Sequence, residues 1–183
     1  MFEEKLAWHC GPALAGIKAG NLVVFKKSEF ADINYRIDLL NEKFNKKDIY
    51  FNIVCQCEKR AMVFVYRKNK LTKYLERPEI KNFLLAYGYS DFSDVNALIK
   101  RLSERLKTAE FPHEIGAFLG YPIEDIKGFI NHRDKDCKLV GDWRVYSNPE
   151  TAELTFKRYK TVRKTILERM SHGKSLDEIF CAA

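Results

Sequence analysis

The sequence lacks any hydrophobic run long enough to cross a membrane. Its longest apolar stretches, Leu22–Phe25 and Ala61–Tyr66, fall well short of the roughly 18 to 20 residues that a spanning helix needs. The opening residues, MFEEKLAWHC, are acidic and polar and do not resemble a secretory signal. The five cysteines lack the paired spacing of a disulfide-stapled secreted domain. These absences predict a cytoplasmic protein with free thiols and no membrane association.

The composition is that of a single folded domain. A chain of 183 residues with 46% hydrophobic and 13% aromatic residues can bury a core, so we expect one domain over residues 1–183. The net charge is +7, from 32 basic and 25 acidic residues. Part of the excess lies in FKRYKTVRK, residues 156–164, where the basic side chains would spread around most of a helix. That spread indicates a solvated helix more than a groove for nucleic acid.

Hydrophobic patterning predicts an α+β fold with a small, mainly antiparallel sheet of about four strands. The four expected strands are Leu22–Phe25, Ile49–Gln56, Arg60–Arg67 and Trp143–Tyr146. The middle two should form a hairpin, because only a few residues separate them. From Leu71 to Ile130 the pattern is helical throughout. Strands and helices therefore partly segregate along the chain, which is typical of the α+β class.

Further helices are expected towards the two ends of the chain. Pro12–Gly20 has a proline at its start and a glycine at its end, which is typical of a short helix. Residues 31–47 carry apolar side chains at helical spacing. A long basic helix should run from Asn148 to about Met170, and Ser175 should cap a short terminal helix.

The segment EFPHEIGAFLGYPIEDIKGFI, residues 110–130, carries several chemical signals. Its His113-Glu114 pair is half of a zinc-protease motif, but Ala117 stands where the second histidine would be. No other group of His and Cys residues has the spacing of metal ligands, so we predict no metal site.

The same segment predicts two helices that meet at a corner. Pro112 would open the first helix, Gly120 would end it and Pro122 would open the second. The spacing also fits a helix-turn-helix, but Glu124 and Asp125 would face DNA phosphates, so sequence-specific DNA binding is the least favoured function. Five apolar residues should form the buried side of the corner: Ile115, Phe118, Leu119, Ile126 and Phe129.

A second group of chemical signals lies in WHCGPALAGIKAG. If a helix starts at Pro12, Cys10 lies at its N-terminus, where the helix dipole lowers the pKa of a thiol. His113 is then the best candidate for the base, because adjacent residues such as His9 and Cys10 seldom face each other. The start of this helix, with Lys18 nearby, could also hold an anion. The alternative is that Cys10 packs as a small hydrophobic residue.

Three blocks of the chain resemble one protein family. HCGPALAGIKAGNLVVF, FPHEIGAFLGYPIEDIKGFI and GDWRVY, followed by an aromatic-rich basic helix, are similar to an uncharacterised family of mainly anaerobic Gram-positive bacteria, classified as a domain of unknown function (number 3793). The resemblance implies a stand-alone bacterial cytosolic protein and supplies no activity, cofactor or catalytic residue. The family often has Cys-Ala-Pro-Thr in the first block. This chain has Cys10-Gly11-Pro12-Ala13, so no role for a hydroxyl at position 13 is carried over.

A ligand site is expected where the three blocks meet. An apolar pocket with a few convergent polar groups is the usual form of such a site, and six residues would supply its groups: His9, Lys18, Glu114, Tyr121, Trp143 and Tyr146. Two functions stay open. One is a binding or regulatory module for a small ligand or a redox partner protein, and the other is a thiol-dependent enzyme that uses Cys10 and His113. The residues indicate no substrate, cofactor or oligomeric state.

Overall fold

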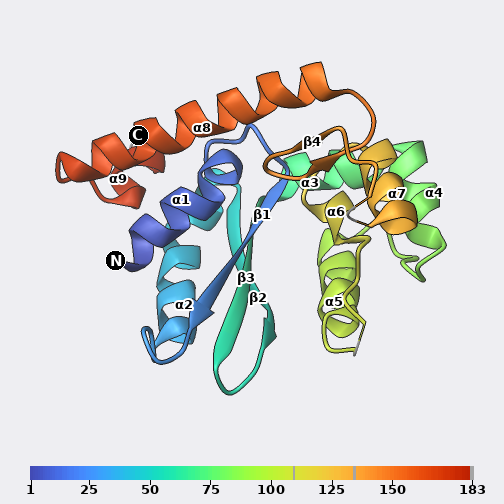
Figure 1. The fold of residues 1–183 in the computed structure, drawn as a ribbon. Coiled ribbons are helices and arrows are strands. Elements are labelled where there is room, and N and C mark those ends of the chain that lie inside the picture. The colour runs from blue at the N-terminus through green and yellow to red at the C-terminus, as the bar shows by residue number, and fades with distance from the viewer. Residues whose placement is uncertain (109, 134, 182–183) are drawn as a thin grey trace.

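The computed structural model describes residues 1–108, 110–133 and 135–181, and its fold is α+β (Figure 1). The strands are β1 (Gly20–Lys26), β2 (Ile49–Gln56), β3 (Arg60–Arg67), β4 (Leu139–Val140) and β5 (Arg144–Val145). The helices are α1 (Phe2–Leu14), α2 (Ile33–Phe44), the 3-10 helix η1 (Asn45–Lys47), α3 (Lys68–Leu75), α4 (Pro78–Leu85), α5 (Val95–Arg105), α6 (Ile115–Phe118), α7 (Ile123–His132), α8 (Pro149–Ser171) and α9 (Leu176–Phe180).

The main sheet is antiparallel and has the strand order β1-β3-β2. β2 and β3 form the expected hairpin with the expected bounds, and β1 is longer at both ends than the apolar run that predicted it. The expected fourth strand, Trp143–Tyr146, does not join this sheet. Only Arg144–Val145 is a strand there, and it pairs with Leu139–Val140 as a separate two-stranded sheet.

The two faces of the main sheet carry two different cores. Successive residues of a strand point to opposite faces. On β3, Phe64 and Tyr66 pack with residues of α3 to α7, whereas Val63 and Val65 pack with α1, α2, α8 and α9. Figure 1 shows α1 and α2 on one side of the sheet and α5 and α6 on the other. The sheet therefore separates any group in one core from any group in the other.

Helix α1 begins ten residues earlier than the prediction placed it, at Phe2 instead of Pro12. Its buried residues Phe2, Leu6, Cys10 and Leu14 recur every four positions and form one face against the sheet. Pro12 lies inside the last turns of this helix, where it donates no hydrogen bond to the preceding turn. Tertiary packing of the apolar face offsets that loss, which is why the proline does not mark the helix start.

Two glycines shape the path from α1 into the sheet. Gly16 has a φ of 71° just after the helix, the left-handed conformation common at helix ends. Gly20 is the first residue of β1 and lies under the ring of Phe64. A Cβ at Gly20 would meet Phe64 Cε2 at 2.4 Å and the Phe118 carbonyl oxygen at 2.8 Å. The glycine therefore allows β1 to approach the corner closely.

The predicted corner within residues 110–130 is present. Its first helix, α6, is shorter than expected because it begins at Ile115 and not at Pro112. Gly120, with a φ of 68°, ends the first helix, and Pro122 directly precedes α7. The residues predicted for its buried side are buried, apart from the half-buried Phe129: Ile115, Phe118, Leu119 and Ile126.

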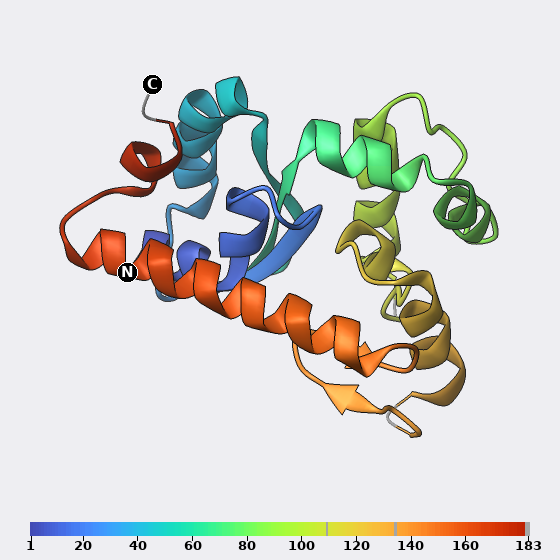
Figure 2. The same ribbon diagram turned by 90° about the horizontal axis from the view of Figure 1, so that it is seen from above.

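The long helix α8 crosses the top of the molecule and links its two halves (Figures 1 and 2). It starts as expected at Asn148, whose side chain accepts a hydrogen bond from Thr151 N at 3.0 Å. Towards its C-terminus it packs on α1, where Ile166 Cδ1 lies 3.0 Å from the position of a Cβ on Gly11. Near its start, Phe156 lies edge-on to Trp143, with ring centroids 4.5 Å apart.

Candidate functional site

A cavity of about 240 Å³ lies between the corner and the segment around β5. Its walls are mainly aliphatic and aromatic, and the residues that line it include Leu22, His113, Tyr121, Asp125, Phe129 and Trp143. We call this space the aromatic cavity. A cavity of about 150 Å³ with a similar lining is large enough to bind benzene. The aromatic cavity therefore has room for a small ring-containing molecule.

Asp125 holds the wall of the aromatic cavity in place. This side chain is only 2% exposed, and its Oδ2 accepts a hydrogen bond from Trp143 Nε1 at 2.7 Å. Its Oδ1 accepts from the backbone N–H groups of Tyr146 and Ser147, both at 2.8 Å, and from Ser147 Oγ. Four donors satisfy this buried carboxylate, so it fixes the segment 143–147 against α7 and has little capacity left for a ligand.

Tyr121 and Trp143 form a stacked aromatic pair at the cavity. Their ring centroids are 5.2 Å apart and their planes differ by 29°. The Tyr121 hydroxyl donates to the backbone oxygen of Asp142 at 3.1 Å, and burial raises the pKa of Tyr121 above its ordinary value. Both residues were predicted to belong to a ligand site, and the structure places both in this one cavity.

His113 is one of the polar residues that line the cavity. The imidazole is half-buried, lies edge-on to Phe129 with centroids 5.1 Å apart, and has Nε2 in contact with Arg133 Nη1. A guanidinium only donates, so Nε2 accepts and the ring proton of the neutral form lies on Nδ1. Burial lowers the pKa of His113, and the positive charge of Arg133 lowers it further. His113 is therefore neutral at pH 7.

Tyr146 does not line the cavity but packs behind its wall, against α7. Its ring lies so close to Gly128 of α7 that a Cβ there would meet Tyr146 Cγ at 2.5 Å. Its hydroxyl donates to the backbone oxygen of Arg133. Tyr146 thus joins the segment after β5 to α7 and to the residue that contacts His113.

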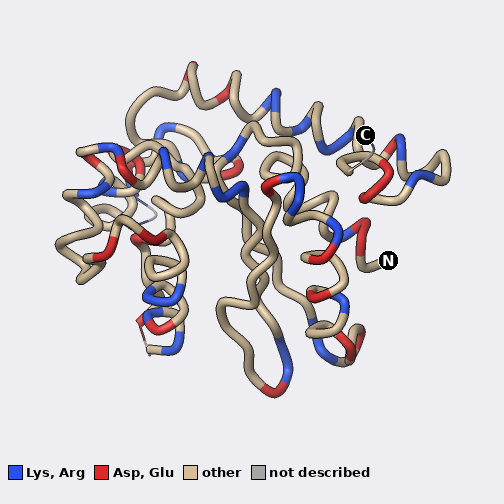
Figure 3. The backbone as a smooth tube through the Cα atoms, turned by 180° about the vertical axis from the view of Figure 1, so that it is seen from behind, with Lys and Arg blue, Asp and Glu red and all other residues tan. Residues whose placement is uncertain are grey.

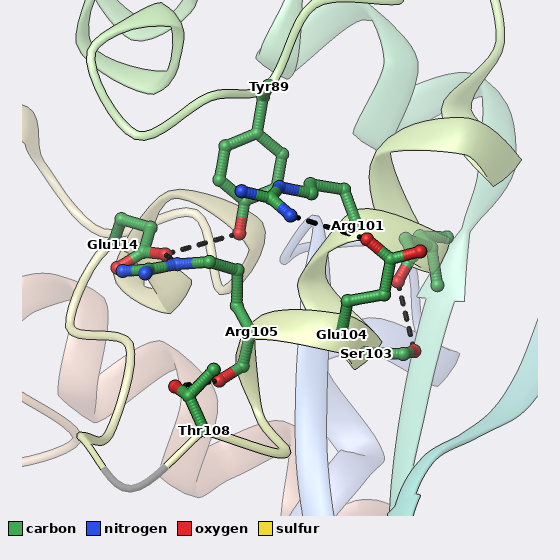
Figure 4. A network of polar contacts seen from close by, with 8 residues as sticks. Tyr89, Arg101, Ser103, Glu104, Arg105, Thr108 and Glu114 are labelled. Carbon is green, nitrogen blue, oxygen red and sulfur yellow. Dashed lines mark hydrogen bonds and ion pairs between the residues drawn. The ribbon is translucent and has the colours of Figure 1, made fainter.

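Glu114 does not line the cavity and belongs to a separate polar network (Figure 4). Its side chain is 1% exposed, and Oε1 accepts hydrogen bonds from Arg105 Nε at 2.8 Å and from the Tyr89 hydroxyl at 3.3 Å. Burial raises the pKa of Tyr89, and the nearby carboxylate raises it further. The network ties α5 and the segment before it to the corner, so Glu114 has a structural role.

Lys18 is buried and does not line the aromatic cavity. Its ammonium lies 4.9 Å from the ring centroid of Tyr121 and 5.6 Å from that of Tyr159. It lines a second cavity with three other basic residues, Lys70, Lys73 and Arg77. Lys18 was expected beside the N-terminus of a helix, but it follows the C-terminal end of α1.

The structure corrects the expected environment of Cys10. This thiol lies inside α1 with no exposed surface, in the core on the far side of the sheet from Ile115 and the corner. Burial raises the pKa of Cys10, whereas a helix start would have lowered it. The sheet therefore separates Cys10 from His113. His9 is exposed on α1 and lines neither the aromatic cavity nor the Lys18 cavity.

Within the described residues, no group of three or more His, Cys, Asp and Glu side chains could hold a metal ion, and no described helix is long and apolar enough to span a membrane.

Lys and Arg positions recur along α8 and across the rest of the chain, with acidic positions between them (Figure 3). Glu124 is exposed at the start of α7, as the prediction required. Asp125 is buried, so the prediction that it would face DNA phosphates is wrong.

Sequence reasoning missed the structural role of Asp125 and the contact between Arg133 and His113. The donors to Asp125 follow it by 18 to 22 residues, so no local motif links them. The one available signal was the unusual GDWRVYSNP stretch, in which Trp143, Tyr146 and Ser147 all carry groups that need partners when buried.

A family model described as "Protein of unknown function (DUF3793)" matches residues 6–180. The match covers nearly the whole chain and confirms the resemblance found in the three sequence blocks. No curated protein and no solved structure matches the chain.

Proposed function

This chain belongs to the DUF3793 family, and we propose that it is a binding module that takes a small, largely apolar molecule into the aromatic cavity. The cavity itself carries the proposal. Ligand sites are typically concave and lined mainly by apolar and aromatic side chains, and this cavity of about 240 Å³ has such walls. The stacked rings of Tyr121 and Trp143 offer a flat surface for a planar ligand.

The polar groups of the wall narrow the chemistry of the ligand. The carboxylate of Asp125, the hydroxyl of Tyr121 and the guanidinium of Arg144, whose Nη1 lies 4.0 Å from Cys137 Sγ, already have partners within the protein. His113 is neutral and has its proton on Nδ1, so it can donate one hydrogen bond. A compact ring with one hydrogen-bond acceptor fits these walls best.

Tryptophan fluorescence gives a direct test of ligand binding. The chain has two tryptophans, and Trp8 is 56% exposed, so Trp8→Phe leaves Trp143 as the reporter at little cost to stability. Toluene, phenol and benzyl alcohol serve as probes. Each should change the Trp143 emission saturably and raise the melting temperature. Dissociation constants on the order of 1 mM, about −4 kcal/mol, are expected for molecules of this size.

A pair of variants on one strand separates cavity binding from surface binding. Leu22 lines the cavity, and Val24 lies two residues further along the same face of β1 but is 39% exposed. Leu22→Phe should fill part of the cavity and weaken probe binding at least tenfold, whereas Val24→Phe should not change it. If the wild type binds no probe, or if both variants bind equally well, the aromatic cavity is not a ligand site.

The thiol-dependent alternative receives no such support. Cys10 is buried, its pKa is raised, and the sheet separates it from His113. The absence of sequence-specific DNA binding stays a prediction, based on the exposed Glu124 at the start of α7.

A further inference from the structure

The buried ammonium of Lys18 has no carboxylate partner among the described residues. The side chain is 4% exposed, and its contacts through the ammonium are the rings of Tyr121 and Tyr159. The charge of Asp142 acts on Lys18 and raises its pKa, but this carboxylate is already paired with Arg163. The pair has two contacts, from Oδ1 to Nη2 and from Oδ2 to Nη1. A buried charge without an ion-pair partner is costly and is commonly retained for a function.

Lys18 lines a cavity of about 260 Å³ together with three further cations. Lys70 and Lys73 come from α3, and Arg77 follows that helix; all three are exposed at the rim. No described Asp or Glu lines the cavity. The negative charges of Glu79 and Glu124 raise the pKa of Tyr74, but neither residue lines the cavity. We call this space the basic cavity.

Some of the other polar groups at the basic cavity already form hydrogen bonds within the protein. The remaining groups are hydrogen-bond donors, which favours a ligand with several acceptor atoms. Lys70 Nζ donates to the Gly16 carbonyl oxygen at 2.6 Å, which holds it at the rim. The Tyr74 hydroxyl donates to the Tyr121 carbonyl oxygen at 2.6 Å. Arg77 lies 5.0 Å from the Tyr74 ring, which leaves the N–H groups at the edge of its guanidinium for a ligand. Lysine and arginine side chains only donate hydrogen bonds, so nearly all the side-chain groups that the cavity offers to a ligand are donors.

We propose that the basic cavity binds the phosphate group of a small phosphorylated molecule, with Lys18 as the buried contact and Lys73 and Arg77 at the rim. A phosphate group carries up to two negative charges and several strong acceptor oxygens, which matches convergent lysine and arginine donors. Four cations around one cavity of about 260 Å³ suit a single phosphate group better than an extended polyanion such as a nucleic acid. This site is distinct from the aromatic cavity, and the two are linked by the contact of Lys18, which lines the basic cavity, with the ring of Tyr121, which lines the aromatic cavity.

The contact between Lys18 and Tyr121 provides a readout. Lys18 contacts the ring of Tyr121, and Tyr121 stacks on Trp143. An anion that draws the ammonium of Lys18 towards itself changes the environment of this stack. Phosphate binding should therefore alter the fluorescence of Trp143 in the Trp8→Phe background, and calorimetry supplies an independent measure of affinity.

The test titrates inorganic phosphate, pyrophosphate and glucose 6-phosphate at constant ionic strength. Saturable binding of at least one of them is expected, and glucose 6-phosphate distinguishes a site for organic phosphates from one for the free ion. Lys18→Met keeps the aliphatic stem and removes the charge, so it should weaken binding at least tenfold. Lys73→Gln at the rim should weaken it a few-fold. Lys68→Met is the matched control, since Lys68 contacts the ring of Tyr50 and does not line the cavity.

Each outcome decides the proposal. It is overturned if the wild type shows no saturable binding at constant ionic strength, or if Lys18→Met and Lys68→Met bind phosphate equally. If Lys18→Met does not fold, Lys73→Gln and Arg77→Gln give the answer, because both residues are exposed; unchanged affinity in both variants overturns the site. Leu22→Phe blocks the aromatic cavity alone, so either site can fail while the other stands.

Discussion

Trp143 donates its indole N–H to the buried carboxylate of Asp125 at 2.7 Å, and this bond connects α7 to the segment that forms one wall of the aromatic cavity. Three further donors from Tyr146 and Ser147 converge on the same side chain. The position of Trp143 therefore depends on one carboxylate that lies 18 residues earlier in the chain.

Asp125→Ala should destabilise the protein by about 3 kcal/mol or more, because it leaves a buried indole N–H and two backbone N–H groups without an acceptor. Glu124→Gln is the matched control, since this neighbouring residue is exposed, and it should cost less than about 0.5 kcal/mol. Urea unfolding measures both changes. Hydrogen exchange should also show faster exchange of the amides of Tyr146 and Ser147 in Asp125→Ala. Equal stability of the two variants would contradict the assigned role.

The pair of Arg105 and Glu114 should be far more important for stability than the nearby pair of Arg101 and Glu104 (Figure 4). Arg105→Met leaves the carboxylate of Glu114, 1% exposed, buried without its cation and should cost about 3 kcal/mol or more. Arg101→Met removes an ion pair whose side chains are 42% and 51% exposed, so the cost should stay within about 1 kcal/mol.

Glu114→Gln completes the comparison of the two pairs. It should cost less than Arg105→Met, because Arg105 is 30% exposed and can be solvated when unpaired. Chemical denaturation gives all three free energies of unfolding. The reverse order for Arg105→Met and Arg101→Met would show that the buried pair is not the stabilising one.

The hairpin strands β2 and β3 could be predicted from local pattern alone. β2 and β3 alternate between two apolar faces with only a short connection between them, and both ends of each strand matched the structure. The start of α1 could not be predicted by the same reasoning, because Pro12 gives a local signal for a helix start. The competing signal, apolar residues at every fourth position from Phe2 to Leu14, acts through packing on a sheet that lies later in the sequence.

The candidate site was predicted in part. Tyr121, Trp143 and His113 meet at one cavity, as the convergence of the sequence blocks suggested. Cys10 and His113 do not meet, because which face of the sheet each helix covers is a property of the whole topology. Nothing within a few residues of Cys10 specifies that face. The same limit hid the partners of Asp125.

Cys57 should be the most reactive of the five cysteines, and Cys10 the least. Cys57 is exposed in the hairpin turn, and hydrogen bonds from the backbone N–H groups of Lys59 and Arg60 lower its pKa. Cys10 is fully buried and its pKa is raised, so alkylation requires an opening that costs several kcal/mol. Its labelling in the folded protein should be on the order of 1000-fold slower than in the unfolded protein.

Mass spectrometry after timed iodoacetamide labelling, at several pH values, measures the rate at each cysteine. Protein unfolded in urea is the control, and there all five thiols should react at similar rates. Fast labelling of Cys10 in the folded protein would contradict its burial and would revive the thiol-dependent enzyme as a hypothesis.

Lys18→Met should stabilise the protein at neutral pH, and the gain should disappear as the pH rises. Burial and, to a smaller extent, the charge of Arg163 lower the pKa of Lys18 from its ordinary 10.5 to about 8, although the carboxylate of Asp142 opposes the shift. Below pH 8 the folded state must keep a poorly solvated charge. The difference between the two pKa values corresponds to a free-energy cost of about 3 kcal/mol for this charge. Between pH 8 and 10.5 the unfolded state binds more protons than the folded state, so the stability contributed by this group rises with pH.

The measurement is the free energy of unfolding of the wild type and of Lys18→Met from pH 7 to pH 10. The variant should be more stable by about 1 to 3 kcal/mol at pH 7, and the difference should shrink steadily above pH 8. Lys68→Met is the control, because Lys68 is only half-buried and its variant should show no such trend. Saturating phosphate should reduce the advantage of Lys18→Met at pH 7, because only the wild type gains from binding the anion. A variant that is less stable than the wild type at every pH would show that the contacts of Lys18 with Tyr121 and Tyr159 hold the fold together, and that the ammonium is not a costly group kept for a ligand.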